Sequence, residues 1–355
     1  MNATTVAVDL AKSVFQLAIA DEQWHIIGRE RLTRGQFERW FANREVKRVI
    51  MEACGSAHHW GRWLRARGIE ATLLPAHYVR AYVKRNKTDA ADAVALLEAA
   101  RASEIKPVAV KSVEQQALQG LHRAREAWKS TRTRRINTLR GFCREFGLVV
   151  PEGAVTGIAQ IARYLADEQS AIPAMLRGTM RLMLEEIRLM EARIGQLEQQ
   201  LGNVAKESPA CQALLTVPGI GLITSTAMVA AVGDPRSFAC GRRYASFLGL
   251  TPREYSSGEH RYLGRISKRG DRYVRMLLVH GARSVLRSAT VATRIGRPVD
   301  PLKRWALAVQ ARTNHNKAAC ALANKMARIA WAVWVKHENY RAQDVGASTP
   351  IALSI

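Results

Sequence analysis

Short apolar runs separated by polar turns fill the first hundred residues and predict an α/β domain. Brief apolar runs, alternating or continuous, indicate strands, whereas longer stretches with apolar residues three and four positions apart indicate helices. On this basis we predict helices over residues 35–43, 58–67 and from 89 to about 102. The same pattern predicts strands over residues 4–9, 14–20, 25–31, 46–52 and 69–74.

Three strands, a helix, a strand, a helix and a strand is the order of an RNase H-like sheet. In that fold the first and fourth strands lie side by side. Asp9 closes the apolar run Val6-Ala7-Val8, and Glu52 closes the run Val49-Ile50-Met51. We therefore expect these two carboxylates to be neighbours.

The pattern becomes helical after about residue 105. Residues 112–146 form a long basic helical stretch, and residues 176–201 have apolar positions at alternating spacings of four and three. These positions are Leu176, Met180, Met183, Ile187, Met190, Ile194, Leu197 and Leu201. They predict a coiled-coil seam. The seam either joins two copies of the chain or pairs with another helix of the same chain, and the pattern alone does not choose.

The last third of the chain is predicted to be mainly helical. The turn Val217-Pro218-Gly219-Ile220-Gly221 before an apolar helix is typical of a helix-hairpin-helix, whose glycines let backbone N–H groups approach a phosphate. We divide the chain into an α/β domain (1–105), a basic helix and coiled-coil linker (106–208), a helical C-terminal domain (209–340) and a tail (341–355).

Charge narrows the class of partner. The 355 residues carry a net charge of +24 and the pI is about 10.6, which points to nucleic acid or an anionic membrane. No apolar stretch approaches the roughly 18 residues of a membrane span, and no leader peptide is expected. The five cysteines lie far apart, which fits neither a disulfide framework nor a zinc site and favours the reducing cytoplasm.

The basic side chains form two groups. Between residues 121 and 144 one acid opposes eight cations. Such a run can be a solvated helix face, but its one-sided sign favours a phosphate backbone. The candidate nucleic-acid ligands here are Arg123, Arg125, Lys129, Arg132, Arg134, Arg135 and Arg140. The second group is Arg261, Arg265, Lys268, Arg269 and Arg272.

Four carboxylates are the candidate metal ligands: Asp9, Glu52, Asp89 and Asp92. Each could simply be a surface residue, and Asp89 and Asp92 could favour the positive end of a helix. However, two acids close strands, and the other two lie three apart on one helix face. Such oxygen ligands suit Mg²⁺ or Mn²⁺, and a pair of these ions clamps a phosphodiester during cleavage.

A candidate nucleophile lies in Tyr255-Ser256-Ser257-Gly258, just before the second group of cations. A serine at this place is more often a turn residue. Ser256 and Ser257 are chemically alike, and sequence physics alone does not choose between them.

Several motifs resemble the DEDD insertion-sequence transposases of the IS110 type, which are related to Piv-type DNA invertases. The resemblance covers nearly the whole chain. It rests on Val8-Asp9-Leu10-Ala11-Lys12, Met51-Glu52-Ala53, Asn86-Lys87-Thr88-Asp89-Ala90-Ala91-Asp92-Ala93, Val217-Pro218-Gly219-Ile220-Gly221, Gly249-Leu250-Thr251-Pro252, Ser257-Gly258, Ser267-Lys268-Arg269-Gly270, Asn316-Lys317-Ala318 and Ala323-Asn324-Lys325.

The resemblance implies a RuvC-like nuclease domain, a coiled-coil linker and a C-terminal transposase domain. It implies that Asp9, Glu52, Asp89 and Asp92 bind Mg²⁺ and that Ser257 attacks DNA. It also implies donor and target DNA as substrates, a structured bridge RNA as guide, a homodimer or homotetramer, and a nucleoid-associated cytoplasmic protein.

Two other functions are compatible with the same residues. A RuvC-like structure-selective endonuclease, such as a junction resolvase, would use water in place of Ser257 and leave no protein–DNA adduct. A non-catalytic DNA- or RNA-binding protein would need none of the acids, and the presence of all four argues against it.

Overall fold

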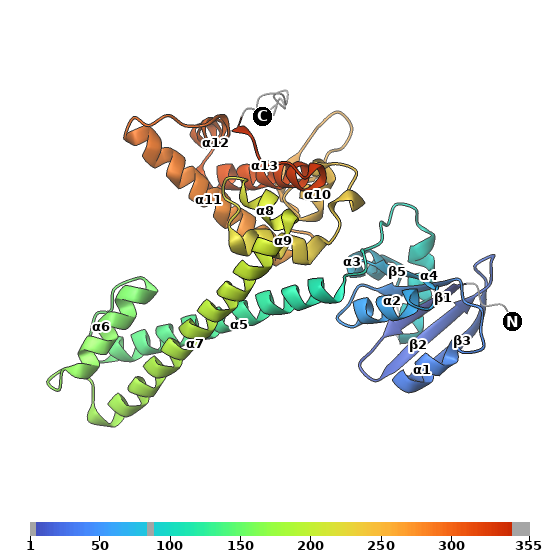
Figure 1. The fold of residues 1–355 in the computed structure, drawn as a ribbon, viewed down its shortest axis with the longest axis horizontal. Helices are drawn as coiled ribbons and strands as arrows, with labels where there is room; N and C mark the ends of the chain where they lie inside the picture. Colours follow the sequence, from blue (N-terminus) through green and yellow to red (C-terminus); the bar gives the residue numbers. More distant parts are fainter. Residues whose placement is uncertain (1–4, 84–88, 343–355) are drawn as a thin grey trace. The chain divides into compact units, whose positions relative to one another are not determined.

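The computed structural model describes residues 5–83 and 89–342, which form two compact units (Figure 1). The first unit extends from Met1 to Val113 and the second from Glu114 to Ile355. The first is a mixed α/β unit and the second is mainly helical, so we describe each by itself. In the described part of the chain, no helix is both long and apolar enough to cross a membrane.

The first unit is built on a five-stranded sheet with the order β3-β2-β1-β4-β5. The strands are β1 (Thr5–Leu10), β2 (Val14–Ala20), β3 (Ile26–Thr33), β4 (Arg48–Glu52) and β5 (Glu70–Leu74). Strands β1 and β4 are parallel, with Val8 opposite Met51. The five predicted strands are thus confirmed, and the carboxyl ends of β1 and β4 meet at one edge.

Helices cover both faces of this sheet. Helices α1 (Arg34–Trp40) and α2 (Ala57–Arg65) cover one face. There Phe15, Phe37 and Trp60 pack edge to face, with ring centroids 5.0–5.3 Å apart. Helix α4 (Asp89–Arg101) covers the other face through small side chains, which let it approach closely. Two short helical segments, α3 (Ala76–Val79) and η1 (Arg80–Tyr82), precede α4.

The second unit begins with two long helices, α5 (Val113–Glu145) and α7 (Ala174–Glu207), joined through α6 (Ala154–Ala166). Arg125 pairs with Glu198 and Arg135 with Glu186, so α5 and α7 run antiparallel. Of the two arrangements left open by the heptad pattern, the structure shows internal pairing. The residues that α7 buries are Met180, Leu184, Ile187, Met190, Ile194, Leu197, Leu201 and Ala205.

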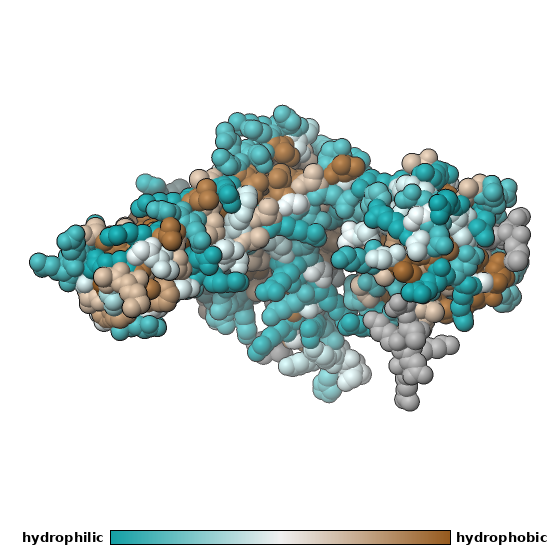
Figure 2. Space-filling model, turned by 90° about the horizontal axis from the view of Figure 1, so that it is seen from below, coloured by the Kyte–Doolittle hydropathy of each residue, from teal (hydrophilic) through white to brown (hydrophobic). Residues whose placement is uncertain are grey.

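The rest of the second unit is a helical cluster with a small ribbon. Its elements are α8 (Pro209–Leu215), α9 (Leu222–Val232), η2 (Pro235–Ser237), α10 (Gly241–Phe247), β6 (Pro252–Glu254), β7 (Leu263–Ile266), α11 (Arg272–Arg294), α12 (Pro301–Arg312) and α13 (His315–Lys336). The antiparallel ribbon β6–β7 was not predicted from the sequence. Hydrophilic side chains cover most of the face seen in Figure 2, as a strongly charged chain requires.

Candidate active site and nucleic-acid interface

Asp9, Glu52 and Asp92 lie on three elements, β1, β4 and α4, and face the layer between the sheet and that helix. Ala7 and Ile50 contact the core beneath α4. Side chains alternate along a strand, so Asp9 and Glu52, two positions further on, face the same side. On α4, helical spacing places Asp92 in line with Leu96 and Ala99, which face the sheet. One carboxylate oxygen of Asp92 is buried.

The fourth acid, Asp89, is the first residue of α4, but its side chain lies outside the described residues, as does the preceding Asn86-Lys87-Thr88. Among the described side chains, no three His, Cys, Asp or Glu residues are already gathered as a metal cluster. The donor chemistry nevertheless fits a hard cation, because Asp9, Glu52 and Asp92 all offer carboxylate oxygens on the same side of the sheet.

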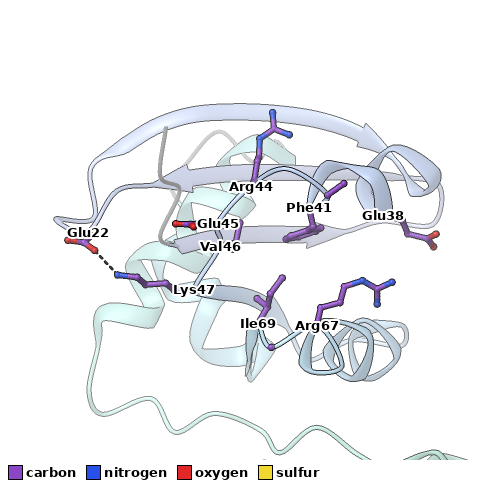
Figure 3. Close-up of a pocket in the computed structure, with 11 residues that line it drawn as sticks. Glu22, Glu38, Phe41, Arg44, Glu45, Val46, Lys47, Arg67 and Ile69 are labelled. Atoms are coloured by element: carbon purple, nitrogen blue, oxygen red, sulfur yellow. Dashed lines mark hydrogen bonds and ion pairs between the residues drawn. The ribbon is translucent and has the colours of Figure 1, made fainter.

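A surface cleft lies elsewhere on the first unit (Figure 3). Its volume is about 690 Å³. Val46 and Ile69 form part of its floor, next to the first residues of β4 and β5, and the ion pair Glu22–Lys47 (2.7 Å) closes one side. Asp9 and Glu52 lie at the opposite ends of their strands. The cleft therefore does not belong to the candidate metal site.

The ribbon β6–β7 ends in a tight turn that carries the predicted nucleophile. Ser257 and His260 exchange two backbone hydrogen bonds, each 3.1 Å long, so only two residues form the turn. Gly258 is the first of them and has φ +56°, a value that favours glycine in such hairpins. Ser257 is exposed, and the imidazole of His260 projects from the directly opposite position on the same face.

The two serines lie on opposite faces of the ribbon. The Ser256 hydroxyl donates to Glu254 (2.8 Å) and accepts from the backbone N–H of Tyr262 (3.2 Å). Arg261 donates to the same Glu254 carboxylate at 3.2 Å, which marks this face as internally hydrogen-bonded. Among the described residues, the Ser257 hydroxyl has no hydrogen-bond partner. The structure thus separates two serines that the sequence left equivalent.

The later cations lie on three successive elements: Arg265 on β7, Lys268 and Arg269 in the loop after it, and Arg272 at the start of α11. Arg265, Lys268, Arg269 and Arg272 are exposed and have no acidic partner within the described ranges. A Cβ on Gly270 would lie 1.7 Å from the carbonyl oxygen of Phe247, so only glycine permits this approach. Lys268 has φ +55°, an uncommon conformation for a residue with a side chain. Such a strained and exposed lysine marks a candidate anion site.

The basic helix α5 has a different environment, because most of its cations have partners in the chain. Arg125 pairs with Glu198 (2.6 Å) and Glu126 (3.1 Å). The other ion pairs are Lys129–Glu126, Arg132–Glu191 and Arg135–Glu186. The Arg140 guanidinium donates to the carbonyl oxygens of Pro151 and Gly153. Of the predicted ligands on α5, Arg123 and Arg134 are exposed and have no acidic partner among the described residues.

The glycine turn between α8 and α9 also differs from the expectation. A Cβ on Gly281 of α11 would lie 2.0 Å from the carbonyl oxygen of Gly219. Gly219 therefore serves close packing between backbones, and only Gly221, which is exposed before α9, is open to a phosphate.

A buried polar group that sequence reasoning missed connects α5 to the start of α11. His122 Nε2 lies 3.1 Å from the Thr226 hydroxyl, and Nδ1 lies 3.2 Å from the Tyr273 hydroxyl. The Thr226 hydroxyl donates to the Leu222 carbonyl oxygen. Nε2 must then carry the proton, and the Tyr273 hydroxyl donates to Nδ1. Burial, and then Arg125, lowers the pKa of His122 to about 4. A single histidine in a helical pattern gives no sequence signal for this role.

Comparison with known proteins gives a consistent family assignment. Residues 211–296 match the model described as the transposase IS116/IS110/IS902 family, and residues 6–146 match an IS110 DEDD transposase model. A probable family 20 transposase of Pseudomonas aeruginosa is 41% identical over 96% of this chain and 99% of its own length. The transposase for insertion sequence element IS1111A of Coxiella burnetii is 38% identical over 95% of this chain and 91% of its own length. A pilin gene-inverting protein of Moraxella bovis is 26% identical over 73% of this chain and 75% of its own length.

Proposed function

Because the chain belongs to the IS116/IS110/IS902 family of transposases, we propose that it cuts and rejoins DNA with a metal-binding carboxylate site and Ser257 as nucleophile. Transposases of this family catalyse DNA cleavage and strand transfer. The observation that carries the proposal is the tip of the ribbon, where the exposed Ser257 hydroxyl has no hydrogen-bond partner among the described residues.

The carboxylate site is proposed on an RNase H-like sheet. Asp9, Glu52, Asp89 and Asp92 would hold Mg²⁺ or Mn²⁺, supported by the shared face of the first two acids and by the buried oxygen of Asp92. When bound, the ions would polarise the scissile phosphate and stabilise the leaving oxygen. Neutral side chains at these four positions would remove the negative charge that holds the metal ions.

Ser257 would act by covalent catalysis. Its Oγ forms a bond to the phosphorus, the bond from phosphorus to one strand end breaks, and that end leaves as a hydroxyl after taking a proton. The serine proton needs an acceptor, and the imidazole of His260 is placed across the turn from it. The ester between serine and DNA keeps the phosphodiester energy, so rejoining requires no external source.

The partners follow from the same proposal. Donor and target DNA are the substrates. A structured bridge RNA would choose the sites by base pairing, while the protein contacts helix shape and backbone. A homodimer or homotetramer would bring two sets of catalytic groups together. The net charge of +24 supports extensive contact with nucleic acid.

The serine is tested by Ser257→Ala with Ser256→Ala as the matched control. Ser257→Ala should lose recombination and the protease-sensitive DNA adduct, whereas Ser256→Ala should keep both. The readout is a denaturing gel of labelled DNA before and after protein digestion. Normal recombination by Ser257→Ala would show that this serine is not the nucleophile.

The carboxylate site is tested by Asp9→Asn and Asp92→Asn. Both variants should lose cleavage while retaining DNA affinity in a filter-binding assay, and EDTA should have the same effect on the unaltered protein. Cleavage that persists in EDTA contradicts the metal site. Cleavage that needs metal but leaves no protein adduct would instead favour the water-dependent endonuclease.

A further inference from the structure

Two exposed tyrosines share the ribbon face that carries Ser257. Tyr255 lies directly opposite Tyr262, as shown by the hydrogen bond from the Tyr255 N–H to the Tyr262 carbonyl oxygen (2.9 Å). Side chains alternate along a strand, so both rings project on the same side as Ser257 and His260. The contacts among Glu254, Ser256 and Arg261 on the other side confirm this division.

The two tyrosine rings are exposed to solvent, but their positions are defined by contacts within the ribbon. Tyr255 is 58% exposed and Tyr262 is 65% exposed, and neither belongs to a hydrophobic cluster of the described residues. Their centroids are 6.2 Å apart at an interplanar angle of 47°. Gly264 lies beneath Tyr255, since a Cβ there would be 3.0 Å from Cε2 of the ring. One face of Tyr255 thus rests on a glycine of the opposite strand, and the ring is held in a defined place.

As a cross-strand pair the two rings contribute only modestly to the stability of the ribbon, and their exposed faces suit a flat aromatic ligand. Every nucleobase has such a face, and stacking on aromatic side chains is a usual way to hold single strands. The exposed cations Lys268 and Arg269 follow in the same segment and can provide charge for the phosphates. The position of the rings beside Ser257, the proposed nucleophile for DNA, favours a nucleobase over a peptide or lipid partner.

We propose that Tyr255 and Tyr262 form a stacking site for an unpaired base of the DNA strand that Ser257 attacks. The proposal rests on the function proposed above and assigns it a substrate conformation. Ser257 is two residues from Tyr255, about 7 Å along a strand, which corresponds to about two base steps. The bound base would therefore lie close to the scissile phosphate, and binding would favour DNA that is locally unpaired there.

The test uses the full-length Ser257→Ala protein, so that no cleavage disturbs binding. The probe is single-stranded DNA that contains 2-aminopurine, whose fluorescence falls when it stacks on an aromatic ring. Tyr255→Leu and Tyr262→Leu should each weaken binding about 5- to 100-fold, as expected from the worth of one stacked base. Both should also reduce the quenching. Tyr255→Phe and Tyr262→Phe keep the rings and should bind within about twofold of the parent.

Three outcomes would overturn the proposal. The leucine variants could bind and quench as the parent does. They could lose equal affinity for duplex DNA, which would indicate backbone contact without stacking. They could lose affinity only for single-stranded RNA of the same sequence, which would make the guide the ligand.

Gly264→Ala provides a second, independent test of the geometry. The added methyl group should displace the Tyr255 ring and weaken binding to single strands. In a Tyr255→Leu background the same change should have almost no effect, because the ring is already absent. Equal effects in both backgrounds would contradict the placement of Tyr255. None of these binding readouts depends on catalysis, so failure of the stacking site and failure of Ser257 as nucleophile are distinguishable.

Discussion

Helix α5 and the segment from Arg261 to Arg272 both carry dense runs of cations, but these cations have different neighbours. On α5, Arg125, Arg132 and Arg135 pair with glutamates of α7. In the later segment only Arg261 has an acidic partner among the described residues, and that partner, Glu254, lies on the same ribbon. The first run mainly joins two helices, whereas the second remains available to an anion.

The difference shows that a dense run of cations in the sequence does not by itself produce unpaired positive charge on the surface of the protein. The three glutamates that neutralise α5 lie at positions 186, 191 and 198, more than 50 residues away along the chain. They reach α5 only because the two helices run antiparallel. The loop that carries Lys268 and Arg269 is instead fixed by close backbone approaches at Gly249 and Gly270. Neither cation has an ion-pair partner among the described residues, because the nearby Asp271 carboxylate caps α11.

The largest effect on DNA affinity is expected from the later segment. The triple variant Lys268→Gln, Arg269→Gln and Arg272→Gln removes three exposed cations. If each contacts one phosphate, the slope of log K against log salt falls by about 3, and duplex affinity at physiological salt falls roughly 100-fold. Fluorescence anisotropy at several salt concentrations measures both. A slope that changes by less than one would mean that this loop does not contact the backbone.

The matching variant on α5 should affect stability more than binding. Arg125→Gln, Arg132→Gln and Arg135→Gln breaks the ion pairs with α7. Arg125 is only 11% exposed, so its loss leaves Glu198 poorly compensated. We expect the free energy of unfolding in urea to fall by about 2–3 kcal/mol. The salt slope of DNA binding should change by less than about one. A large fall in slope with unchanged stability would reverse the assignment of the two regions.

The two regions are connected at His122, and this connection should be sensitive to acid. Its pKa is about 4 in the folded chain because of burial, against an ordinary value of 6.5. Between pH 6.5 and 4 the unfolded chain binds a proton that the folded chain does not. The free energy of unfolding is therefore highest at neutral pH and falls as the pH is lowered through this range, by on the order of 2 kcal/mol.

Urea unfolding at pH 7 and pH 5 measures this dependence. In His122→Gln, the acid sensitivity of the second unit should diminish. His58 serves as the control, because burial and then Lys111 lower its pKa to about 4 within the first unit. The acid sensitivity that His58 gives to the first unit should persist in the His122→Gln protein. An unchanged pH dependence of the second unit would mean that His122 is already protonated in the folded chain.

Much of the fold could be predicted because local pattern determines it. Strands β1, β2, β4 and β5 each contain a buried apolar run, and the heptad spacing marks the buried face of α7. The partner of that face could not be predicted, since the same spacing serves two chains or one. The ribbon β6–β7 was missed because its strands are short and exposed and therefore lack apolar alternation.

The candidate site was predictable only in part, for a related reason. Asp9 and Glu52 close buried strands, so their placement follows from strand order. Ser256 and Ser257 differ only in the face of a ribbon, which requires the cross-strand register. His122 has partners on α9 and α11, more than 100 residues away, so no local pattern could reveal it.

The smallest effect is expected for Arg134, a cation of α5 that does not pair with α7. Arg134 is exposed and has no acidic partner among the described residues, and it lies beside Ser130, Asn137 and Thr138 on a polar groove of the helix. Arg134→Gln should leave stability within about 0.5 kcal/mol of the parent, as for most surface substitutions. If the groove contacts nucleic acid, the salt slope falls by about one and affinity falls roughly fivefold. Arg132 lies two positions earlier on the helix and pairs with Glu191, so Arg132→Gln is the matched control and should not change the slope. An Arg134→Gln slope equal to that of the parent would show that Arg134 does not contact nucleic acid.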